Sequence, residues 1–185
     1  MPCDPAQVYQ PEADTFLLLE AAQDEAKPGD RVLEIGTGSG RIACALLRTC
    51  DVVATDINPH AVFCARNAGL NVVRCDLFSG LRGRFDLILF NPPYLPTRPE
   101  ERIDDWLEYA LDGGITGRDT IGRFAAAVGG VLSPGGRILL LISSLTGLSG
   151  VRELFAAHGF TVDVVRRQVV EDEELFVLRI TRATP

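Results

Sequence analysis

The sequence lacks long apolar runs and paired cysteine motifs, and it has a single lysine. Its uninterrupted apolar segments are short, such as residues 138–142, well below the roughly 20 residues that a membrane-spanning helix needs. No basic cluster leads into a hydrophobic segment near the start, so we expect no secretory signal and a cytoplasmic protein. The five cysteines are odd in number and form no C-x-x-C pair, which argues against zinc ribbons and disulfide frameworks and favours thiols packed as small apolar groups.

The charge balance excludes one broad class of partner. With 25 acidic and 18 basic residues, the formal net charge is −7, and Lys27 is the only lysine. Phosphate backbones need a positive field, so sequence-independent nucleic-acid binding is not expected. Hydrophobic residues make up 46% of the chain and no low-complexity tract or repeat is present, so we predict one folded domain over residues 1–185.

Strand-like and helix-like segments alternate along the chain. Near-continuous apolar strands that alternate with helices predict an α/β fold with a mostly parallel sheet, helices on both faces and a C-terminal antiparallel hairpin. A turn is expected at 133–136, and 171–174 is expected to be a solvated turn within the hairpin. The expected strands are 31–35, 52–56, 71–75, 85–90, 137–143, 160–168 and 174–181, and the expected helices are 41–48, 59–68, 119–132 and 150–158.

A glycine-rich turn joins the first strand to the first of these helices. It carries Gly36, Gly38 and Gly40, whose missing side chains let backbone amides approach a ligand closely. The pattern differs from the dinucleotide fingerprint, which would place a glycine where Arg41 stands, and this weakens a nicotinamide interpretation.

Acidic residues end the second and third expected strands. Asp56 and Asp76 therefore lie on the same sheet edge as the glycine turn, where Asp56 can accept hydrogen bonds from ribose hydroxyls. Asp76 alone could equally be a turn cap. Three signals in register on one edge predict a nucleotide-like cofactor site.

These residues resemble the class I methyltransferases that use S-adenosylmethionine. The resemblance covers nearly the whole chain and implies a Rossmann-like seven-stranded methyltransferase sheet. It implies that Glu34 and the glycines Gly36, Gly38 and Gly40 pack around the amino-acid and ribose portions of the cofactor, and that Asp56 binds the ribose. It also implies that Asp76 faces the adenine amino group, between Ile57 and Leu77 as walls of the adenine slot.

The tetrapeptide Asn91-Pro92-Pro93-Tyr94 follows the fourth expected strand on the same edge. Two prolines fix the backbone and leave carbonyls that only accept hydrogen bonds. If the Asn91 side-chain oxygen and the Pro92 carbonyl each accept one N–H of a planar NH2 group, the poorly nucleophilic nitrogen is oriented toward the methyl donor while Tyr94 stacks on the planar group. Asn91 then also borders the cofactor. The motif is shared by methyltransferases that act on adenine, cytosine and protein glutamine, so it identifies the acceptor group and not the molecule.

The N-terminal segment narrows the resemblance. Residues 8–19 are similar to the opening of the HemK-like release-factor glutamine methyltransferases, in the short archaeal and eukaryotic form. That resemblance implies that residues 1–30 border the cofactor site, through Tyr9, Asp14 and Thr15; for Asp14 a helix N-cap, and for Tyr9 simple packing, are the alternatives. It implies methylation of the glutamine N5 atom in the Gly-Gly-Gln motif of a class I release factor.

The same resemblance implies a partner, a small zinc-binding activator that joins through an exposed sheet edge. The expected strand at 71–75 is the edge in the usual order of this fold, although its valines could equally be core residues of a self-sufficient edge.

Other interpretations remain open from the sequence. A nucleobase could be the acceptor, although the net acidity argues against it, or another protein side chain. The chain could also be a cofactor-binding scaffold without activity. Trp106 and Tyr109 could line a substrate groove or only pack, and no metal site is expected.

Overall fold

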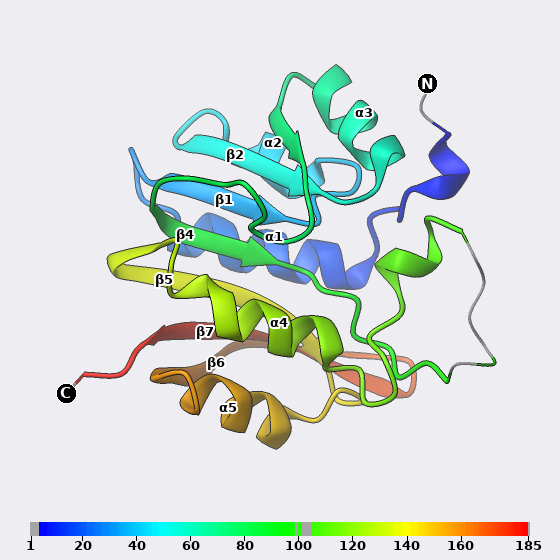
Figure 1. The fold of residues 1–185 in the computed structure, drawn as a ribbon, viewed down its shortest axis with the longest axis vertical. Helices are drawn as coiled ribbons and strands as arrows, with labels where there is room; N and C mark the ends of the chain where they lie inside the picture. The colour runs from blue at the N-terminus through cyan, green and yellow to red at the C-terminus, as the bar shows by residue number, and fades with distance from the viewer. Residues whose placement is uncertain (1–3, 99, 101–104, 185) are drawn as a thin grey trace.

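A seven-stranded sheet in the order β3-β2-β1-β4-β5-β7-β6 forms the centre of the protein (Figure 1). The computed structural model describes residues 4–98, 100 and 105–184, so the first three residues of the expected N-terminal segment lie outside it. Neighbouring strands from β3 through β5 are parallel, and β7 runs antiparallel to both β5 and β6. The strands are β1 (Arg31–Ile35), β2 (Asp51–Asp56), β3 (Asn71–Arg74), β4 (Phe85–Phe90), β5 (Leu132–Ser143), β6 (Phe160–Val170) and β7 (Glu173–Arg182).

Helices cover both faces of this sheet, as expected for parallel strands that are apolar throughout. In Figure 1, α4 and α5 lie in front of the sheet and α1 crosses behind it. The buried residues of α1, α2 and α3 form one hydrophobic cluster with one face, and those of α4 and α5 form a second with the other. The helices are α1 (Ala13–Glu25), α2 (Arg41–Leu46), α3 (Pro59–Asn67), α4 (Asp119–Val128) and α5 (Leu148–Ala156), with short 3-10 turns η1 (Pro5–Gln7) and η3 (Glu108–Ala110).

The central strand β4 shows why a continuous apolar run forms a strand here. Leu87 and Leu89 belong to the cluster beneath α1, while Ile88 and Phe90 belong to the cluster beneath α4. Successive side chains of a strand point to opposite faces, so both faces of β4 are apolar and both are covered. The predicted sheet and its antiparallel C-terminal hairpin are therefore confirmed.

The largest departure from the predicted boundaries lies between α4 and β5; the bounds of the other predicted elements differ by two residues at most. The helix ends at Val128, not at 132, because Gly129 and Gly130 follow and favour chain reversal over helix. The expected turn at 133–136 is included in β5, where the register against β4 shifts between Phe85 and Leu87 and Gly135 has a φ of +72°. The turn residues thus form an irregular start to the strand.

The cysteine expectation is also partly wrong. Cys44, Cys50 and Cys75 are free thiols, but Cys64 is disulfide-bonded. Among the described residues, no helix combines the length and the apolar composition needed to cross a membrane.

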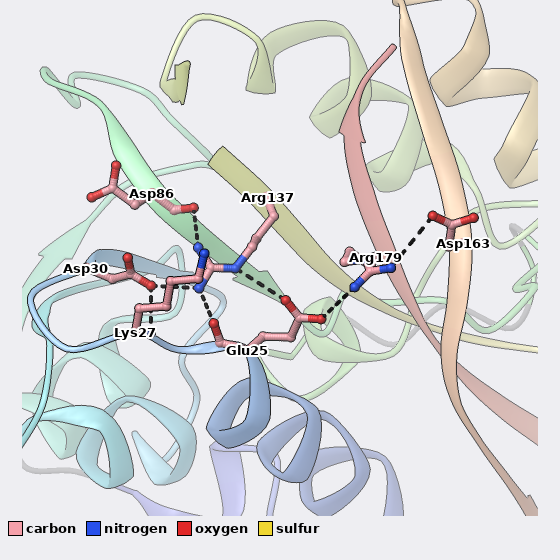
Figure 2. Close-up of polar contacts among 7 residues, drawn as sticks. All are labelled: Glu25, Lys27, Asp30, Asp86, Arg137, Asp163 and Arg179. Carbon is pink, nitrogen blue, oxygen red and sulfur yellow. Dashed lines mark hydrogen bonds and ion pairs between the residues drawn. The ribbon is translucent and has the colours of Figure 1, made fainter. Parts of the chain in front are cut away.

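A cluster of charged groups fastens α1 to the edge of the sheet where the parallel strands begin (Figure 2). The Arg137 side chain, on β5, is about one-tenth exposed and lies 2.7 Å from the Asp30 carboxylate and 3.4 Å from that of Glu25 at the end of α1. It also donates to the carbonyls of Glu25 and Asp86. Arg179, on β7, extends the cluster by pairing with Glu25 at 3.1 Å. The buried Arg137 guanidinium thus joins α1, β4 and β5, and α1 is held at its C-terminal end.

Candidate functional site

A cavity opens where the parallel strands β1, β2 and β4 end. Carboxyl ends of parallel strands meet at one edge of a sheet, the usual place for ligand sites in wound α/β folds. Among the described residues, no group of three or more His, Cys, Asp or Glu side chains could hold a metal ion. The cavity is lined by nearly all the residues that the sequence singled out: Tyr9, Asp14, Thr15, Glu34, Gly36, Gly38, Asp56, Ile57, Asp76, Leu77, Asn91, Pro92, Pro93 and Tyr94.

The glycines of the β1–α2 turn divide into two roles. Gly36 and Gly38 have φ values of +65° and +54°, and an added Cβ would meet no protein atom nearer than 3.7 Å, so bare backbone faces the cavity. Gly40 is not among the residues that line the cavity; a Cβ there would lie 2.7 Å from the Leu70 side chain and 3.6 Å from Ala65. Gly40 therefore serves the close packing of α3 and the residues after it, and its contact with a cofactor stays a prediction.

The Glu34 side chain stabilises the glycine turn through hydrogen bonds. Its carboxylate accepts hydrogen bonds from the Thr37 hydroxyl at 2.5 Å and from the Ala43 amide at 3.1 Å. Burial raises the pKa of this carboxyl from 4.5 to about 8, although both hydrogen bonds lower it. A buried group with such partners fixes the shape of the turn that faces the cavity.

Asp56 joins the end of β2 to the same turn. One carboxylate oxygen accepts from the Gly38 amide at 2.8 Å and the other from the Asn58 amide at 2.9 Å. Burial raises the pKa of this carboxyl, and its backbone hydrogen bonds oppose that shift. Each oxygen has a further lone pair that a hydroxyl donor in the cavity can use.

Asp76 lines the cavity but is not free. Its carboxylate is paired with the guanidinium of Arg123 on α4. Arg123 also lines the cavity, and sequence reasoning did not select it. No motif marks Arg123, because its position follows from how α4 packs on the sheet. Leu77 follows Asp76 with a φ of +48°, an unusual conformation for a leucine, and it lines the cavity beside them.

The four residues of the tetrapeptide all line the cavity, and Asn91 has one side-chain oxygen without a partner. Its Nδ2 donates to an oxygen of Asp14 at 2.9 Å. A carboxylate only accepts, so this contact fixes the orientation of the Asn91 amide. The Asn91 Oδ1 atom is buried and has no hydrogen-bond partner among the described residues. Unpartnered buried acceptors are uncommon in folded proteins and need an explanation.

Asp14 is the centre of this arrangement. Besides Asn91, the same oxygen accepts from the Tyr9 hydroxyl at 3.0 Å and the Tyr94 hydroxyl at 3.4 Å. The other oxygen accepts from Thr15, through its amide at 2.5 Å and its hydroxyl at 3.2 Å. The alternative that Asp14 is the N-cap is wrong, since it is the second residue of α1 and position 12 precedes the helix.

Both tyrosines remain hydrogen-bond donors. Burial, and after it the negative charge of Asp14, raise the pKa of the Tyr9 phenol and of the Tyr94 phenol. Two neutral hydroxyls therefore hold the carboxylate that orients Asn91, and packing is not the whole role of Tyr9.

Two loops support the tetrapeptide from the α4 side. A Cβ on Gly113 would lie 3.0 Å from the Pro93 carbonyl oxygen, and one on Gly117 would lie 2.3 Å from that of Tyr94. The Thr146 hydroxyl donates to the same Tyr94 carbonyl at 3.3 Å. Sequence reasoning missed these supports, although the pair Gly113-Gly114 was a visible signal.

Trp106 and Tyr109 line the same cavity, with ring centroids 5.3 Å apart. The Trp106 amide donates to the Gln7 side chain at 3.1 Å, and the Arg74 guanidinium lies 5.7 Å from the Trp106 ring centroid. The two aromatic residues are therefore part of the cavity and do more than pack on a helix face.

Comparison with known proteins shows the family of this chain. Residues 10–103 match the family model described as the methyltransferase small domain. A Methanocaldococcus jannaschii protein named as a putative protein N5-glutamine methyltransferase is 44% identical, over 95% of this chain and 92% of its own. Human methyltransferase HEMK2 is 33% identical, over 96% of this chain and 91% of its own.

A solved structure is also similar to this chain over nearly its whole length. Mtq2 of E. cuniculi, described in complex with Trm112 as responsible for methylation of the eRF1 translation termination factor, has a TM-score of 0.81 and 28% identity. The match covers 96% of this chain and 99% of that one.

Proposed function

Because the chain belongs to the HemK2-like family of protein N5-glutamine methyltransferases, we propose that it methylates the glutamine N5 atom in the Gly-Gly-Gln motif of a class I release factor. The observation that carries the proposal is the unpartnered Oδ1 of Asn91, buried at the cavity wall while Nδ2 is held by Asp14. Such an acceptor suits one N–H of a primary amide.

The cavity fits S-adenosylmethionine, the methyl donor of this class of enzyme. The bare backbone at Gly36 and Gly38 leaves room for a ligand against the turn, and the free lone pairs of Asp56 suit ribose hydroxyls. Ile57 and Leu77 supply apolar walls for an adenine ring. The donor set, backbone amides with a buried carboxylate, supports binding of an uncharged ribose rather than a phosphate.

Asn91 and Pro92 carry the chemistry on the acceptor side. S-adenosylmethionine supplies, when bound, a methyl group on a positively charged sulfur. An amide nitrogen is a poor nucleophile because its lone pair is delocalised. The Asn91 Oδ1 and the Pro92 carbonyl accept its two N–H groups, which orients the nitrogen and favours tetrahedral geometry. Fixed acceptors of this kind need no reorganisation as the reaction proceeds.

Tyr94 and Asp14 complete the acceptor site. The Tyr94 ring can stack on the planar amide, and its hydroxyl donates to Asp14. The nitrogen becomes acidic once it bonds to the methyl group, so no side-chain base is required. Asp14 acts through Asn91 and is a positioning residue, and the cofactor-bordering role that the resemblance implied for it stays a prediction.

The exposed edge of β3 is the proposed binding site of a small zinc-binding activator. β3 ends the described sheet, and Val73 on it is an exposed apolar residue. An unpaired edge can accept a strand from another protein. The description of Mtq2 in complex with Trm112 supports a partner protein for this chain. A cytoplasmic location follows if the substrate is a release factor.

The decisive assay supplies labelled S-adenosylmethionine, the activator and a class I release factor. We expect label on the wild-type release factor and none on a variant in which the motif glutamine is alanine. Equal label on both would contradict the substrate assignment. Asn91→Ala should lower kcat by at least about a hundredfold, because one fixed acceptor is lost, while calorimetry shows unchanged cofactor affinity.

A further inference from the structure

Three large apolar side chains are exposed around the catalytic tetrapeptide. Ile115 is 70% exposed in the loop before α4, Leu145 is 56% exposed in the loop after β5, and Val169 is 74% exposed near the end of β6. Single exposed apolar residues are common and need no explanation. They come from two loops and from the end of β6, at the same edge of the sheet, which favours a shared cause.

Contacts tie the first two loops to the tetrapeptide and to each other. Thr146, next to Leu145, donates to the Tyr94 carbonyl at 3.3 Å. Gly117, two residues from Ile115, packs against the same carbonyl. The Arg118 guanidinium donates to the Thr146 carbonyl and so joins the two loops. Both exposed side chains are thus carried by backbone that touches the catalytic segment.

The β6–β7 hairpin continues this edge. The Ser144 amide donates to the Glu174 carbonyl at 2.8 Å, and the Glu174 amide donates to the Ser144 hydroxyl at 3.1 Å. Val169 pairs with Glu174 across the hairpin. Leu145 and Val169 are therefore linked through one residue pair, and the turn of the hairpin lies on the side of the catalytic loop (Figure 1).

The hairpin turn gives the edge a negative charge. Glu171 and Asp172 are exposed, and within the described part of the chain neither forms an ion pair. The negative charges of Glu173, which follows them, and of Glu12 both contribute to the raised pKa of the Tyr94 phenol. Two more carboxylates therefore lie near the catalytic residues. Arg167 offsets part of this charge through a loose contact of 3.9 Å with Glu174.

Glu171 occupies a backbone position that suits glycine. Its φ is +50°, in the left-handed region, where a side chain costs about 1 kcal/mol. A charged residue is therefore present where glycine would make the turn more stable.

We propose that Ile115, Leu145, Val169, Glu171 and Asp172, here called the substrate rim, dock a basic segment of the release factor next to its acceptor glutamine; this rests on the proposed function. The apolar side chains provide area that loses water on contact, and the carboxylates attract lysine and arginine. A factor that works against ribosomal RNA carries basic surface, since phosphate demands it. The rim is continuous with the catalytic loop, where such a substrate must lie. An RNA substrate would be repelled by it.

The rim is tested by substrate kinetics with intact release factor and the activator present. Leu145→Ser combined with Val169→Ser, and separately Glu171→Gly combined with Asp172→Asn, should each raise KM for the release factor by about tenfold. Both should leave kcat and the calorimetric affinity for S-adenosylmethionine unchanged. The KM of the Glu171→Gly/Asp172→Asn variant should also rise less with added salt than the KM of the wild type does.

Matched controls separate docking from stability. Leu47→Ser changes another exposed leucine, at the end of α2, and Glu153→Gln removes an exposed charge on α5; both should keep the wild-type KM. Glu171→Gly is expected to be more stable than the wild type, so a higher KM in this variant cannot come from unfolding. The proposal would be overturned if both rim variants kept the wild-type KM. It would also be overturned if polylysine inhibited the wild type no more strongly than it inhibits the Glu171→Gly/Asp172→Asn variant. If the wild type fails to label the motif glutamine at all, the proposed function itself is wrong and the rim proposal falls with it.

Discussion

Asp14 and Asn91 lie 77 positions apart in the chain and meet at 2.9 Å, carboxylate oxygen to amide nitrogen. Asp14 is the second residue of α1 and Asn91 directly follows β4, so the contact depends on how α1 packs beneath the sheet. Because the carboxylate can only accept, the pair leaves the Asn91 oxygen as an acceptor for a substrate amide.

Asp14→Asn tests this relationship. An asparagine of the same shape can donate as well as accept, so it no longer forces one orientation of the Asn91 amide. We expect kcat to fall by about tenfold to a hundredfold with cofactor affinity little changed. Tyr9→Phe is the control, since it removes one donor to Asp14 and leaves the Asn91 contact. Equal kcat for Asp14→Asn and wild type would argue against a positioning role.

Glu34→Gln should change the dependence of stability on pH. The folded-state pKa of about 8 exceeds the ordinary 4.5, so the folded state binds the proton more tightly than the unfolded state. The stability from this group is complete below pH 4.5 and is lost as pH rises through about 8.

A glutamine stays neutral and still accepts from Thr37 and Ala43. The variant should therefore unfold at a higher temperature than wild type above pH 8, and the difference should shrink toward pH 4.5. Thermal unfolding across this range measures it. A difference that grows as the pH falls would contradict the assignment.

Gly40→Ala should destabilise the protein through packing. The new Cβ would lie 2.7 Å from Leu70 at a φ of +81°, so strain adds to steric conflict. We expect a loss of about 2 to 3 kcal/mol in the free energy of unfolding, from overpacking and left-handed strain together.

Gly69→Ala is the matched control. Its φ is +86° but nothing lies within 4 Å of the new Cβ, so only the backbone cost of about 1 kcal/mol applies. Chemical denaturation compares the two. Equal losses would show that the contact with Leu70 does not constrain position 40.

Arg137→Met should be strongly destabilising, because it leaves Glu25 and Asp30 near one another without their shared cation. Breaking such a buried pair costs about 3 kcal/mol or more. Arg166→Met, which removes an exposed partner of Asp24, should cost about 1 kcal/mol at most. Denaturant midpoints measure both, and a similar small loss for the two variants would contradict the burial argument.

The sheet, its hairpin and the residues of the edge where the strands end were predictable from the sequence. Strand periodicity is a local property, and every motif, from the turn at 36–40 to the tetrapeptide at 91–94, stands directly after a strand. Parallel strands end at one edge, so order along the chain was enough to bring these residues together.

Which of those residues face the cavity, and which contacts they make there, became visible in the tertiary structure alone. Gly40 turns toward α3 and Asp76 pairs with Arg123, while Asp14 orients Asn91. Each of these outcomes depends on the packing of a helix against the sheet, which sets distances between residues far apart in sequence. The hydrophobic periodicity of a helix predicts that one of its faces is buried. It does not predict which side chains of the neighbouring element will contact that face.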